Sequence, residues 1–130
     1  MGIVLMLHSL WRWVVVLVAL VALVKFGLGW LQRKNPELLD RRLTLAFTTV
    51  IDIQVLLGIL VLALQAVGGT LLMPAIEHAG VMILVAILAH ATAMWRKRDD
   101  HTVLRNNFLD VVAVLVLIVI GVSIVNGWHF

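Results

Sequence analysis

Two residues that can do chemistry lie in a strongly apolar segment near the start of the chain. In "LHSLWRW", residues 7–13, His8 and Arg12 are four positions apart, which places them one turn apart on nearly the same face of a helix. An imidazole can bind a metal ion or carry a proton, and a guanidinium can pair with a carboxylate. Because charged groups are costly inside an apolar segment, both side chains need a partner. The segment therefore predicts a buried polar site.

Histidine and carboxylate are the only strong metal ligands in the sequence. The chain has no cysteine, which excludes disulfides, thiolate-ligated iron–sulfur clusters, cysteine nucleophiles and cofactors attached through cysteine. The candidates inside apolar runs are Asp52, Glu77, His78, His90 and Asp110. Any chemistry must therefore use these groups between helices or at helix ends.

Composition places these residues in a membrane protein. Of the 130 residues, 63% are hydrophobic, with a mean hydropathy of +1.12, against roughly 45–50% apolar residues in an ordinary soluble domain. Four apolar runs, near 3–32, 43–66, 73–95 and 106–128, each reach the roughly 20 residues that cross a bilayer as a helix. Short connections make consecutive helices antiparallel. We therefore expect residues 1–130 to form one all-α domain, an integral membrane four-helix bundle with up-down-up-down topology.

The distribution of charge predicts the orientation of this bundle. Residues 32–42 and 95–105 carry four basic residues each, whereas residues 66–74 carry none. The positive-inside rule then places both termini on the outer side, in what we expect to be a bacterial cytoplasmic membrane. The net charge of +3 follows from this topology and does not indicate binding to nucleic acid.

The relative depth of His8 and His78 depends on the end from which residues are counted. At about 1.5 Å per residue, counting from the outer helix ends places His8 and His78 level, about 5–6 Å below the boundary. Counting from the inner ends places His8 about 9 Å above His78. Arg12 is then the residue level with Glu77 and His78.

The two counts support two interpretations. In the first, His8 and His78 are the axial ligands of one b-type haem held between helices one and three. Arg12 then pairs with a haem propionate or with Glu77. Gln65 lies near the level of His78 and would contact a haem edge or a quinone headgroup. In the second interpretation, Arg12 and Glu77 form an ion pair, His8 lies at the headgroup level, and His78 supports a hydrogen bond.

A second polar layer is expected deeper in the bilayer. Asp52, His90 and Asp110 fall about 20–23 Å below the outer surface by the same rise per residue. Because each group is costly there without a partner, we expect them to form one buried hydrogen-bonded cluster, which could also relay protons. His78 and His90 are twelve residues apart and so point about 120° apart around their helix. A stack of two haems is therefore not supported.

Three short segments carry a resemblance to a known group of proteins. "HSLWRW", "DIQVLLG" and "EHAGVM" resemble small bacterial four-span membrane proteins labelled cytochrome b-like, and the resemblance covers all but the last helix. It implies a haem b with two histidine ligands, carried here onto His8 and His78. Asp52 stands where the pattern would have a further histidine, so a second cofactor is not expected.

Two functions of different classes follow from these observations. The first is a cytochrome b-like electron-transfer protein or redox subunit of a respiratory chain, with haem b near the outer face and quinone as a candidate partner. The second is a haem-free accessory subunit of a larger respiratory or photosynthetic membrane complex, which would dock other subunits through its apolar faces. A stand-alone enzyme is not indicated. A transporter is not favoured, because the spans have no proline or glycine break at their centres.

The orientation can be tested with single cysteines, since the chain has none of its own. Thr70→Cys should react with a membrane-impermeant maleimide added to intact cells, because its loop is expected outside. Lys34→Cys, in a basic loop, should react only after the cells are opened. Labelling of Thr70→Cys from the cytoplasmic side alone would reverse the predicted topology.

Overall fold

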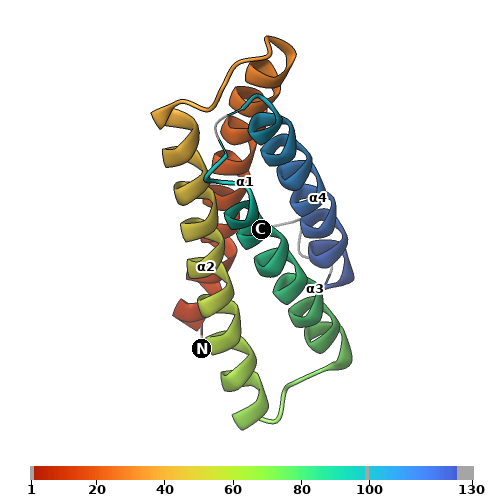
Figure 1. Ribbon diagram of the computed structural model, residues 1–130. Coiled ribbons are helices and arrows are strands. Elements are labelled where there is room, and N and C mark those ends of the chain that lie inside the picture. Colours follow the sequence, from red (N-terminus) through yellow and green to blue (C-terminus); the bar gives the residue numbers. More distant parts are fainter. Residues whose placement is uncertain (1, 99, 126–130) are drawn as a thin grey trace.

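The computed structural model describes residues 2–98 and 100–125, which form four long helices with short connections. The helices are α1 (Gly2–Leu31), α2 (Leu38–Val67), α3 (Met73–His90) and α4 (Thr102–Ile124), and the 3-10 turn η1 (Ala91–Met94) continues α3. Each helix is long and apolar enough to cross a membrane. Consecutive helices run in opposite directions (Figure 1). The predicted all-α four-helix bundle of membrane-spanning length is confirmed.

α2 and α4 begin four or five residues earlier than the apolar runs suggested, because polar residues take part in their first turns. α2 starts at Leu38 rather than 43, where Glu37 and Asp40 form a capping box: the Glu37 backbone N–H donates to Asp40 Oδ2 at 2.8 Å. α4 starts at Thr102 rather than 106. Hydrogen bonds from Thr102, chiefly from its hydroxyl, lower the pKa of Asp100 below its ordinary value. The predicted end of the fourth helix, at 128, lies outside the described residues.

The four helices form a ring in which α1 packs against α2 and α4, and α3 packs against the same two helices. α1 and α3 therefore occupy opposite corners of the bundle. We call the end with the α1–α2 and η1–α4 connections the basic end and the end with the α2–α3 connection the uncharged end. Close helix approach near the basic end depends on small residues. A Cβ atom on Gly29 would lie 2.5 Å from Leu104 Cδ1.

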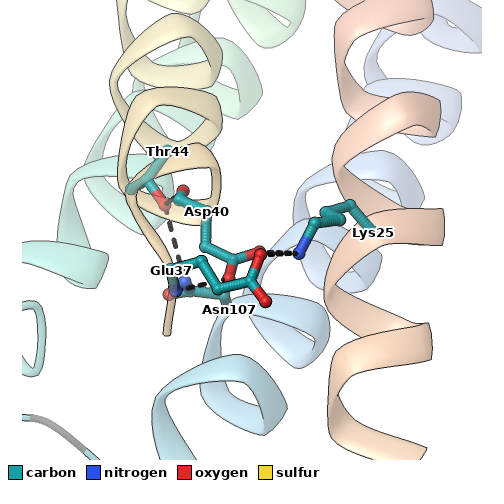
Figure 2. Close-up of polar contacts among 5 residues, drawn as sticks. All are labelled: Lys25, Glu37, Asp40, Thr44 and Asn107. Atoms are coloured by element: carbon teal, nitrogen blue, oxygen red, sulfur yellow. Dashed lines mark hydrogen bonds and ion pairs between the residues drawn. The ribbon is translucent and has the colours of Figure 1, made fainter. Parts of the chain in front are cut away.

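An ion pair between α1 and α2 lies at the basic end (Figure 2). Lys25 Nζ donates to Asp40 Oδ1 at 2.8 Å, and Glu37 Oε2 lies 3.6 Å from the same nitrogen. Asp40 is only 1% exposed. Because a buried carboxylate is costly without a counter-ion, Lys25 compensates a charge that also caps α2.

Hydrogen bonds extend this polar network to α4 and to the end of η1. Thr44 Oγ1 donates to the backbone carbonyl of Asp40 at 3.0 Å, and Asn107 Nδ2 donates to Thr44 Oγ1 at 3.4 Å. Trp95 Nε1 donates to Asn107 Oδ1 at 2.7 Å. The basic end is therefore joined across α1, α2 and α4 by polar side chains as well as by apolar packing.

Removing the ammonium group should reveal the cost of the buried carboxylate. Lys25→Met is expected to lower the free energy of unfolding by about 3 kcal/mol, because Asp40 would be left buried and charged. Adding Asp40→Asn should restore most of that stability, since the amide is neutral and can still cap α2. Unfolding in mixed detergent micelles measures both variants. Lys34→Met, at an exposed position, is the control, and an equal loss for Lys25→Met and Lys34→Met would contradict this role.

Candidate functional site

A cavity of about 350 Å³ lies between the helices in the half of the bundle towards the uncharged end. Its walls are mostly apolar and come from all four helices. Its charged or hydrogen-bonding side chains include His8, Arg12, Gln54, Gln65 and His78. An apolar cavity of this size with a few convergent polar groups is typical of a site for a small molecule or cofactor.

The two histidines face each other inside this cavity. The ring centroids of His8 and His78 are 6.4 Å apart, and the ring planes are nearly perpendicular, at 83°. The side chains reach this position from α1 and α3, the helices at opposite corners of the bundle. Of the two counts of depth, the one made from the outer helix ends is therefore correct for this pair.

His78 is held in one orientation by a backbone group of α4. Its Nδ1 lies 2.7 Å from the carbonyl oxygen of Gly121. A carbonyl can only accept a hydrogen bond, so Nδ1 carries the proton and the lone pair of the neutral ring is on Nε2. A carbonyl that fixes the tautomer in this way is the usual support of a metal-binding histidine.

His8 packs against the side of α2 at a glycine. A Cβ atom on Gly58 would lie 3.1 Å from His8 Cε1, so the absence of a side chain there leaves space for the ring. Gln54 Nε2 donates to the backbone carbonyl of His8 at 2.9 Å. Within the described residues, His8 Nδ1 and Gln54 Oε1 are buried and have no hydrogen-bond partner. The cavity therefore contains polar atoms whose hydrogen-bonding capacity the protein does not use.

Arg12 and Glu77 do not come together as the second interpretation expected. Arg12 lines the cavity, and its Cζ atom lies 5.1 Å from the centroid of the Trp13 ring. Glu77 is exposed and does not line the cavity, and the ion pairs among the described residues do not join it to Arg12. Adjacent helical residues point about 100° apart, so Glu77 faces outward when His78 faces the centre. Glu77 is thus removed from the candidate site.

The predicted cluster of Asp52, His90 and Asp110 is not formed as one unit. His90 Nε2 lies 2.8 Å from Asp52 Oδ1, but this pair is on the surface of the bundle. Asp110 is buried on α4, and its Oδ1 has no hydrogen-bond partner among the described residues. The prediction of one buried cluster is therefore wrong. A shared depth does not bring side chains together when their helices turn them to different faces.

Sequence reasoning did not find the Lys25–Asp40 pair. It also did not find the contacts with His8, which are a hydrogen bond from Gln54 and packing against Gly58. A signal for the ion pair was present, since Lys25 near the end of one span and Asp40 in the first turn of the next have opposite charges at similar depth. Gly58 could have been noticed only by matching the level of His8 along α2. That match requires the register between the two helices.

Comparisons with protein-family models, with curated proteins and with solved structures find no match to this chain. Function is therefore inferred from the chemistry of the cavity itself.

The contact between His8 and α2 can be tested by filling the space at Gly58. Gly58→Leu should lower the free energy of unfolding by about 1–3 kcal/mol relative to Gly80→Leu, because its Cβ atom forces the His8 ring to move. A Cβ atom on Gly80 meets nothing within 4 Å, and both substitutions gain the same helix propensity. Thermal unfolding in detergent measures the difference. Equal stability of the two variants would contradict the packing of His8 on Gly58.

Proposed function

We propose that this chain is a small cytochrome b-like electron-transfer protein that binds one haem b between α1 and α3, where His8 and His78 would hold the iron. The proposal is carried by the two imidazole rings, whose centroids are 6.4 Å apart in the cavity. Metal–imidazole bonds of about 2.0–2.1 Å, the values known for zinc, put two rings that share one ion on the order of 6 Å apart. The observed spacing fits a shared metal ion.

The hydrogen bonds around the two histidines support the same assignment. The Gly121 carbonyl keeps the proton of His78 on Nδ1 and leaves Nε2 as the ligand atom. His8 Nδ1 is buried without a partner among the described residues, so its ring is not committed to a structural hydrogen bond through that atom. Within the described residues, each histidine therefore keeps one ring nitrogen that the protein does not use in a hydrogen bond.

Arg12 and Gln65 supply the polar contacts that such a group needs. Arg12 lines the cavity one turn from His8, where its guanidinium would bind a haem propionate by charge-assisted hydrogen bonds. The amide of Gln65 would bond to a polar edge of the haem or to a quinone headgroup. When bound, the iron supplies one-electron redox chemistry at a potential that its ligands and surroundings tune.

The position of the cavity gives the proposed protein a direction in the membrane. The positive-inside rule places the basic end on the cytoplasmic side of a bacterial cytoplasmic membrane. The haem then lies near the outer face of that membrane, and both termini are outside. The chain then serves as an electron carrier or as a redox subunit beside other subunits of a respiratory complex.

The test is the absorbance spectrum of protein purified in mild detergent from haem-replete cells. We expect a Soret band, with sharp α and β bands on reduction. His8→Ala and His78→Ala should each abolish this low-spin spectrum, whereas His101→Ala, in the connection before α4, should keep it. Added imidazole should restore the spectrum of the alanine variants, because it replaces the missing ligand.

A colourless protein from such cells would reject the haem. The haem-free accessory subunit of a larger membrane complex would then be the remaining function. Haem that stays low-spin in both alanine variants would instead show that other residues hold the iron.

A further inference from the structure

A second group of side chains that could do chemistry lies on the surface of the bundle, where α2 and α3 face each other. His90 Nε2 lies 2.8 Å from Asp52 Oδ1 and 3.0 Å from Asp52 Oδ2, and we call this pair the Asp52–His90 dyad. The side chains of His90 and Asp52 are 54% and 47% exposed. A hydrogen-bonded pair half open to the surroundings differs from the buried polar contacts of the basic end.

The dyad is arranged as an oriented base. Because a carboxylate can only accept a hydrogen bond, Nε2 of His90 donates to Asp52, and the lone pair of the neutral ring is on Nδ1. Nδ1 makes no hydrogen bond within the described part of the chain. A carboxylate that orients an imidazole and stabilises its protonated form prepares the second ring nitrogen to take up a proton.

The surface around the dyad is apolar. Leu56, one turn from Asp52, is 66% exposed, and Ile87 and Ile83, one and two turns before His90, are 62% and 52% exposed. In a bilayer these side chains face hydrocarbon, where an open polar group is costly. A molecule that reaches Nδ1 from this side must therefore be soluble in lipid and must carry a hydrogen-bonding group.

A second cavity, which we call the polar cavity after the side chains in its lining, reaches from His90 towards the basic end. It has a volume of about 300 Å³, and its lining includes His90 and Thr48 at one end and Arg41 and Arg96 at the other, with Asn107 between them. A polar cavity of this size can hold water molecules that bridge such groups. Hydroxyl, amide and guanidinium groups that such water could bridge therefore lie between His90 and the basic end.

We propose that the Asp52–His90 dyad binds the headgroup of a lipid-soluble quinol and takes the proton of its hydroxyl group on His90 Nδ1. Quinols combine the properties that the surface demands, since they dissolve in lipid and carry a hydroxyl donor. Asp52 lies six residues before Gly58, which packs against His8, so the dyad is only about 9 Å along α2 from the level of the cavity histidines.

Electron transfer from this site rests on the proposed function, because the ferric haem is the oxidant. Oxidation of one quinol to the quinone releases two protons and two electrons. The two electrons would pass one at a time to bound ferric haem, either in two molecules of the protein or in one that is reoxidised between the two steps. In each step one proton passes to His90 Nδ1, and water in the polar cavity would accept it before the next.

The experiment measures quinone binding and quinol oxidation separately on the full chain. Calorimetric titration with decylubiquinone and with menadione gives the affinity, and the rate at which decylubiquinol reduces the protein is followed at the Soret band. His90→Gln should weaken binding of at least one quinone about tenfold or more, since it loses the ring that contacts the headgroup.

Asp52→Asn separates the role of the charge from that of the contact. Its amide still accepts the hydrogen bond from His90, so affinity should change little. The rate of haem reduction should fall by about 100-fold, because the protonated imidazole loses its counter-ion. Thr49→Val, one turn away on the same lipid-facing side of α2, should leave both quantities unchanged.

Failure of this inference is distinguishable from failure of the haem proposal. A colourless protein that binds quinone in a His90-dependent way would reject the haem proposal and support quinone binding at the dyad. A normal haem spectrum with equal quinone binding in wild type and His90→Gln overturns the dyad. A wild-type dimer that His90→Gln converts to a monomer, seen by light scattering, also overturns it, because a second copy would then cover this surface.

Discussion

The ion pair between Lys25 and Asp40 sets the register of the first two helices, and the geometry of the cavity depends on that register. His8 lies 17 residues from Lys25 along α1, and Gly58 lies 18 residues from Asp40 along α2. These intervals correspond to about 26 and 27 Å of helix. Two antiparallel helices joined at the basic end therefore bring His8 to Gly58 near the other end. A shift of one turn would place a bulkier side chain against the ring.

The position of residues along the bundle axis could be predicted from the sequence, but the direction of each side chain could not. The four spans, and the common level of His8 and His78 by one of two counts, follow from run length and helical rise. The outward position of Glu77 and the separation of Asp110 from Asp52 depend on how each helix is rotated. In a soluble bundle an apolar stripe reveals that rotation. Here lipid-facing residues are as apolar as the core, so the pattern carries little of this information.

The two halves of the bundle are built differently, and the difference accounts for where chemistry is possible. Near the basic end, the close approach at Gly29 and the polar contacts of Asp40, Thr44 and Asn107 join α1, α2 and α4. Towards the uncharged end, the same helices enclose a cavity with polar atoms that the protein does not satisfy. The polar contacts of the basic end thus help to position the helices that line the cavity of His8 and His78, as sites that must hold a precise geometry require.

Of the neighbouring helix pairs, α2 and α3 are the least extensively packed. The Asp52–His90 dyad joins these two helices. Residues of both also line the cavity with His8 and His78 and, with α3 continued by η1, the polar cavity. The α1–α2 and α3–α4 pairs are more extensively packed. On the side of the ring opposite the α2–α3 contact, α1 packs against α4. A lipid-soluble molecule that approached the half-exposed dyad from the bilayer would therefore meet α2 and α3 first, without crossing water.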